Sequence, residues 1–68
     1  MNQETFNLSI RKFLKMVGIN SQREIEQAVA KAIEGGQIAG TETFPVHVTL
    51  AIPHLQISVK FDGEIELQ

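Results

Sequence analysis

The stretch TFPVHVTLAIPHLQISVKF, residues 43–61, alternates apolar and polar side chains along almost its whole length. A period of two is typical of β-strands that turn one face toward apolar surroundings and the other toward water. We therefore predict strands over about residues 43–52 and 55–60, joined at Pro53 and His54. The fixed φ of Pro53 excludes the usual two-residue hairpin turns, which leaves a type I turn or a four-residue loop of the same parity.

The register of this hairpin follows from where the apolar residues must lie. Placing Ile52 opposite Leu55 also places Leu50 opposite Ile57. All the apolar side chains of both strands then share one face, because residues directly opposite in an antiparallel pair point to the same side. The sequence thus predicts a hairpin with one wholly apolar face.

A third strand is predicted over about residues 64–67. The pair Asp62-Gly63 is a turn signal, and a three-residue loop ending in a Gly63 bulge pairs Val59 with Ile65 and keeps the neighbouring acids off the apolar face. The strands would then form an antiparallel meander in the order 1-2-3.

The first half of the chain has helical periodicity. One apolar stripe predicts a helix over about residues 3–17, capped by Asn2 or Thr5 and ended by a left-handed Gly18. A capping box at Ser21–Glu24 and a second stripe predict a helix over about residues 22–34, which Gly35-Gly36 would end. The stripe residues are Phe6, Ile10, Phe13, Leu14 and Val17 in the first helix and Ile25, Ala28, Val29, Ala32 and Ile33 in the second.

Together these elements predict an α+β fold in a single domain over residues 1–68, with two N-terminal helices packed on a three-stranded antiparallel meander (ααβββ). The chain has 68 residues, which leaves room for one small core.

The composition excludes several kinds of chemistry. The chain has no Cys, Trp or Tyr, so it forms no disulfide, thiolate metal site, cysteine nucleophile or rich aromatic cage. No segment is apolar enough to cross a membrane, and the N-terminus lacks the features of a secretory signal. We therefore expect a cytoplasmic protein without membrane contacts.

The two histidines do not point to catalysis. His47 falls on the polar face beside Lys60 and Glu64, and His54 lies in the turn, so extended chain separates them by roughly 20 Å. The glycines of residues 35–40 follow a helix and lack the Gly-Lys-Ser/Thr ending of a phosphate loop. We expect no catalytic residue, no metal and no cofactor, and thus a protein that is not an enzyme.

Nucleic-acid binding is an alternative that the first half of the chain suggests. The residues before Glu24 carry four cations against the single acid Glu4, although the whole chain has a net charge of −2. A helix-turn-helix-like hairpin around Gly18 could present the candidate contacts, which are Arg11, Lys12, Lys15 and Arg23. Against this, the second helix carries Glu24, Glu26 and Glu34, which have the wrong sign for phosphate contact.

Self-association is the leading prediction. The first strand of the meander would be a long, Val-rich edge guarded only by Pro45, and unpaired edges of this kind associate. With a thin core, this favours a non-enzymatic interaction or accessory module that forms a homodimer, with the candidate edge residues Phe44, Val46, Val48 and Leu50. A small-ligand pocket between helices and sheet is a third possibility.

Three segments resemble a known family of small bacterial proteins of unknown function. They are TFNLSIRKFLK at residues 5–15, SQREIE at residues 21–26 and DGEI at residues 62–65. The resemblance extends over almost the whole chain. It implies a bacterial, cytoplasmic protein and supplies no activity or catalytic residue.

Overall fold

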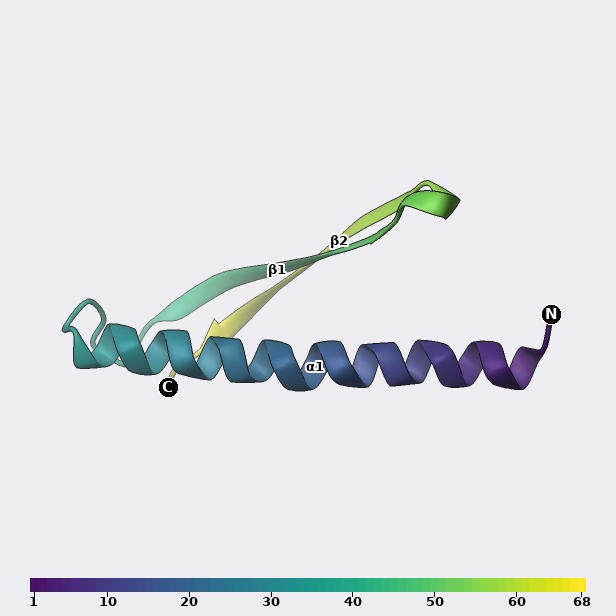
Figure 1. Cartoon of the computed structure of the whole chain (residues 1–68). Coiled ribbons are helices and arrows are strands. Elements are labelled where there is room, and N and C mark those ends of the chain that lie inside the picture. Colours follow the sequence, from purple (N-terminus) through teal and green to yellow (C-terminus); the bar gives the residue numbers. More distant parts are fainter. The chain divides into compact units, whose positions relative to one another are not determined.

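The computed structural model describes residues 1–68, which form one long helix followed by a two-stranded antiparallel sheet (Figure 1). The helix is α1 (Gln3–Glu34), and the strands are β1 (Thr43–Ile52) and β2 (Ile57–Glu66), with the short 3-10 turn η1 (Pro53–Leu55) between them. The chain divides into two compact units, Met1–Gly35 and Gly36–Gln68.

The prediction of two helices is wrong, because α1 runs through Gly18 without a break over 32 residues. Only Gly36 and Gly40 among the glycines have positive φ, so Gly18 is not the left-handed residue that would end a helix. Ser21 therefore lies inside α1 and caps nothing.

The apolar positions explain why the helix continues. The two predicted stripes are in phase across Gly18 and follow one repeat of 11 residues, which corresponds to about 3.67 residues per turn and suits a nearly straight helix. A break would interrupt backbone hydrogen bonds without improving this alignment. The positions in the repeat are Phe6, Ile10, Leu14, Val17, Ser21, Ile25, Ala28 and Ala32.

The ends of α1 agree with the sequence signals. The Asn2 side chain accepts a hydrogen bond of 3.1 Å from the Thr5 N–H, which satisfies one of the free donors of the first turn. At the other end the Gly35 N–H donates to the Lys31 carbonyl at 2.9 Å, and Gly36 adopts a φ of +72°. Glycine suits that position because it has no Cβ to clash.

The hairpin gathers its apolar side chains as predicted, but in a register two residues away. Leu50 lies opposite Val59, and Ile52 lies opposite Ile57. The loop therefore has four residues, Pro53–Gln56, and Gln56 completes it with a φ of 55°. A shift of two preserves parity, so one face still carries only apolar residues and Gly63.

The predicted third strand and meander are also wrong, because β2 continues through Asp62-Gly63 to Glu66. Asp62 lies opposite His47 and Gly63 lies opposite Val46. In this register Phe61, Gly63 and Ile65 continue the alternation along β2, so that ten residues of each strand are paired. A turn at Gly63 would leave the first half of β1 without this partner.

The direction of the backbone groups in β1 follows from one hydrogen bond. The Leu67 N–H donates to the Glu42 carbonyl at 3.0 Å, and these residues continue the register of the hairpin. Because such pairs recur at every second residue, even-numbered residues of β1 bond to β2 and odd-numbered ones point away from it. Pro45 is one of the odd-numbered residues. A proline is tolerated there, because the N–H group that it lacks would point away from β2 and would bond no strand.

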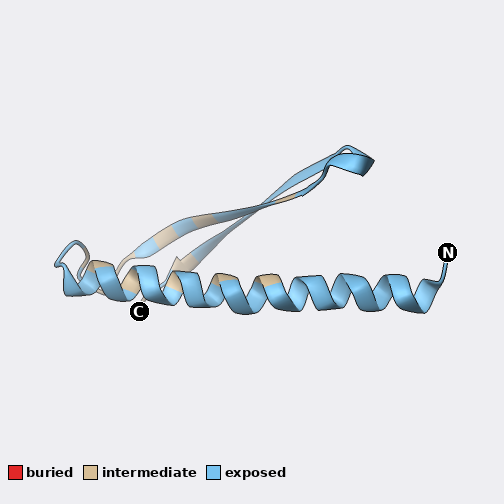
Figure 2. Ribbon diagram, viewed as in Figure 1, coloured by how far each residue is buried: buried red, intermediate tan, exposed pale blue.

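Neither unit buries any residue, as Figure 2 shows by the absence of red. The exposed fraction is 53% for Leu14 in α1 and 57% for Phe61 in β2. Apolar side chains thus line both units without forming a core, and a large apolar surface stays exposed.

The continuity of α1 can be tested with Gly18→Ala. Apart from the adjacent residues and the backbone of α1 itself, no atom lies within 4 Å of a Cβ built at Gly18. Because Ala is better than Gly in a helix interior by about 1 kcal/mol, we expect a higher unfolding midpoint by far-UV circular dichroism. Gly36→Ala is the matched control and lowers the midpoint, because its φ of +72° strains any side chain. A lower midpoint for Gly18→Ala would contradict a continuous helix.

Candidate functional site

The outer edge of β1 is the candidate interaction site. We call this the β1 edge and define it by the odd-numbered residues of the strand, whose backbone groups point away from β2: Thr43, Pro45, His47, Thr49 and Ala51. The strand contains no Asp, Glu, Lys or Arg. Unpaired backbone groups without charged neighbours are the features that let another strand add to a sheet.

The outer edge of β2 differs from the β1 edge in its charge. The residues whose backbone groups point away from β1 include Lys60 and Asp62, which form a salt bridge of 3.6 Å with both side chains more than half exposed. Glu64 and Glu66 follow at the same parity. Charged side chains disfavour the addition of another strand, because their charged groups would lose contact with water. The outer edge of β2 is therefore protected against strand addition, whereas the β1 edge is not.

The predicted edge residues Phe44, Val46, Val48 and Leu50 have a different place from the one expected. All four belong to β1, but their backbone groups bond to β2 and their side chains form part of the apolar face. The backbone groups that point outward are those of the odd-numbered residues of the strand. The signal that could have found them is Pro45, because a proline inside a strand indicates the parity that faces outward.

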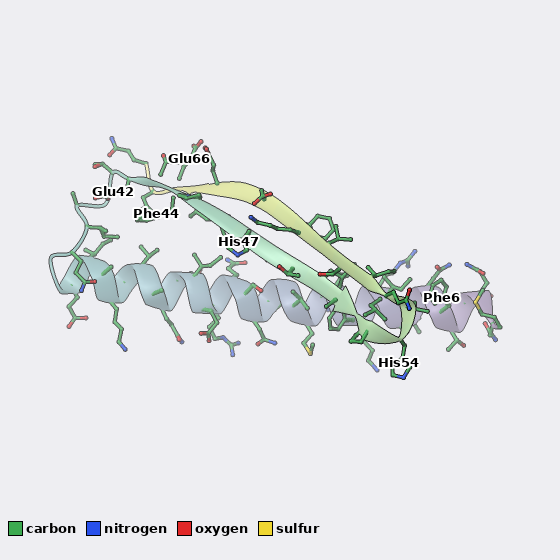
Figure 3. All side chains as sticks on the ribbon, turned by 90° about the horizontal axis from the view of Figure 1, so that it is seen from above. Phe6, Glu42, Phe44, His47, His54 and Glu66 are labelled. Atoms are coloured by element: carbon green, nitrogen blue, oxygen red, sulfur yellow. The ribbon has the colours of Figure 1, made fainter.

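The histidines lie far apart along the hairpin. His47 is in the middle of β1 and opposite Asp62, whereas the prediction placed it beside Lys60 and Glu64. His54 lies in η1 at the tip (Figure 3). The structure contains no group of three or more His, Asp or Glu side chains arranged to hold a metal ion.

The side chain of Glu42 organises the loop that enters β1. No pattern in the sequence predicts this role of Glu42. Its carboxylate accepts hydrogen bonds from the N–H groups of Ala39 at 2.9 Å, Gly40 at 2.9 Å and Thr41 at 3.1 Å. Successive N–H groups of this kind form a nest for an anion, which here is the side chain of the same loop. The bond from Ala39, followed by that from Gly40, lowers the pKa of Glu42 below its ordinary value, because both favour the charged form.

The basic residues lie along α1 and not on a pair of helices. Arg11, Lys12 and Lys15 are exposed in its first half, and Arg23 lies further along. The helix-turn-helix-like arrangement is wrong, because no turn separates the two halves of α1. Nucleic-acid contact by these four side chains stays a prediction, as does the small-ligand pocket.

Neither the surface hollow of α1 nor its apolar side chains provide a further candidate site. A hollow beside its first turns is lined by Glu4, Thr5, Asn7, Leu8 and Arg11, all on the surface of one helix. Although α1 is long, no stretch of it is apolar enough to cross a bilayer.

The chain matches the model of a known protein family. The model of the family described as "Family of unknown function (DUF6494)" matches residues 1–68. No curated protein and no solved structure matches the chain. The match agrees with the predicted resemblance to a family without an assigned function.

The role of Glu42 can be tested by pH. A lowered pKa means that the stabilisation is present above the carboxyl's ordinary pKa of about 4.3 and is lost as the pH falls through the lowered value. We expect the amide resonances of Ala39, Gly40 and Thr41 to titrate with a midpoint below about 4.3 in a two-dimensional NMR pH series. Glu42→Gln removes this titration, whereas Glu64→Gln, a control in β2, preserves it. A titration midpoint of these amide resonances at or above the ordinary carboxyl pKa would contradict the hydrogen bonds from Ala39, Gly40 and Thr41 to Glu42.

Proposed function

The chain belongs to the DUF6494 family of unknown function over its whole length, and we propose that it is a non-enzymatic protein-interaction module that forms a homodimer through its hairpin. The observation that carries this proposal is that the β1 edge has no Asp, Glu, Lys or Arg side chain and lies beside a wholly apolar face.

The size of the hairpin supports the proposal. Two strands alone are marginally stable in water, and three or more strands with a hydrophobic face are needed for independent stability. The sheet has two strands, and none of its residues is fully buried. Pairing with another strand would raise the strand number to the stable range and shield apolar surface on the neighbouring side chains.

The charges of the two strands favour β1 over β2 as the interface. Two copies of β2 side by side would bring into one interface three acids of each chain, Asp62, Glu64 and Glu66, against the single cation Lys60. Like charges directly opposite destabilise a strand pair. Two copies of β1 meet without this penalty, since the strand has no formal charge when His47 is neutral.

A role without catalysis is supported by the distribution of the titratable side chains. His47 lies in β1 opposite Asp62, and His54 lies at the tip in η1, so the two histidines do not share a site. Pairs of polar side chains across a hairpin are ordinary features of a solvated sheet face.

We also propose that the protein is bacterial and cytoplasmic. The resemblance of its segments at residues 5–15, 21–26 and 62–65 to small bacterial proteins supports the origin. The location can be tested by fractionating cells that express a tagged chain, and recovery in the membrane or secreted fraction would contradict it.

The homodimer can be tested by sedimentation equilibrium over a wide range of concentrations. We expect the mass to approach twice 7.6 kDa as the concentration rises. A mass that stays at 7.6 kDa at every concentration would contradict the proposed function.

A matched pair of variants tests whether the β1 edge forms the interface. Ala51 and Ser58 are opposite each other, and both N–H groups point out of the hairpin, so a proline at either position removes no hydrogen bond between β1 and β2. Ala51→Pro removes a donor from the β1 edge in each copy and should raise the dissociation constant at least about tenfold. Ser58→Pro changes only the other edge and should leave it unchanged. Equal effects of the two variants would exclude the β1 edge as the interface.

A further inference from the structure

We propose that β1 pairs with β1 of a second copy in antiparallel orientation, about a two-fold axis that passes through Thr49. This inference rests on the proposed function and adds the register, the symmetry and the contacting residues.

The position of Pro45 selects the register. In an edge-to-edge pair the outward N–H and C=O groups of one strand bond those of the other, and Pro45 interrupts this row because it has no N–H. Its ring also occupies the space into which the partner's carbonyl would come. Registers that place Pro45 within the ladder are therefore disfavoured.

A two-fold axis at Thr49 gives the longest ladder that avoids this conflict. Thr49 then lies opposite Thr49 of the second copy, and His47 lies opposite Ala51, so that all three residues donate and accept in each copy. Pro45 falls opposite Pro53, which is already outside β1. An axis at His47 or at Val48 would instead put Pro45 opposite Thr49 or Ala51, inside the strand.

The side chains fit the same register. Thr49 meets an identical Thr49, a pair that is favourable across strands, and no charged pair is created. On the apolar face, Val48 lies opposite Leu50 of the second copy at a non-hydrogen-bonded position, where side chains come closest. Because outward residues pair with outward residues, the two apolar faces lie on the same side of the resulting four-stranded sheet.

The occupant that these observations favour is a second copy and not an unrelated strand. The outward N–H donors that lie between Pro45 and Pro53, those of His47, Thr49 and Ala51, are symmetric about Thr49, so this part of the edge is complementary to itself. A surface of this kind is what an isologous two-fold interface requires.

Disulfide crosslinking tests the register, because the chain has no cysteine of its own. In Thr49→Cys, the two thiols face each other across the axis with a Cα separation of about 5.5 Å, within the range of a disulfide. We expect most of this variant to become a covalent dimer under mild oxidation, at concentrations where sedimentation shows the unsubstituted chain to be dimeric.

His47→Cys and Ala51→Cys are the matched controls. In each of them alone, the identical residue of the second copy lies four positions along the strand, about 13 Å away, so crosslinking should fall to less than about a tenth of that of Thr49→Cys. Mixing the two variants should restore it, because His47 of one copy faces Ala51 of the other.

The possible outcomes separate this inference from the proposed function. A dimer by sedimentation with no crosslink in Thr49→Cys would overturn the register and leave the homodimer in place. Preferential crosslinking of His47→Cys would move the axis to His47 and likewise overturn the inference. A chain that is monomeric at every concentration would overturn both proposals.

Discussion

The period of two along the hairpin is the constraint on which the other features of residues 36–68 depend. It assigns each residue of β1 and β2 to one face, and together with the hydrogen bond from Leu67 to Glu42 it assigns each backbone N–H and C=O to the inside or the outside of the pair. The apolar face, the pairing of Leu50 with Val59 and the outward direction at Thr49 are consequences of one register. The same constraint makes Pro45 acceptable, because its missing N–H would have pointed outward.

The elements that the sequence predicts correctly are those that periodicity determines. Alternation predicts β1 over Thr43–Ile52, and the apolar stripe predicts helix on both sides of Gly18. The two errors in the number of elements come from local turn signals, at Gly18 and at Asp62-Gly63, where the structure continues α1 and β2. A glycine inside a helix costs about 1 kcal/mol and one inside a strand weakens it, but a break would sacrifice several hydrogen bonds of a regular element.

The candidate site is harder to predict from the sequence, because it consists of backbone groups. Residue types indicate which side chains are apolar, and on that basis the sequence predicts that Val48 and Leu50 share one face of a strand. Whether a backbone group is free depends on the hydrogen-bonded pairs, and thus on the Leu67 to Glu42 bond that sets their parity. The carboxylate of Glu42 is a similar case, since its three N–H partners come together only through the conformation of the loop.

The central claim is that the outward groups of β1, and not those of β2, bind another strand. The most direct measurement is amide hydrogen exchange, resolved by residue and followed from dilute to concentrated protein. The proposed pairing requires slower exchange at Thr49 and Ala51 as the concentration rises, while the outward amides of Ser58 and Lys60 continue to exchange at the rate of the dilute chain. Exchange that slows equally on both strands, or on neither, would contradict it.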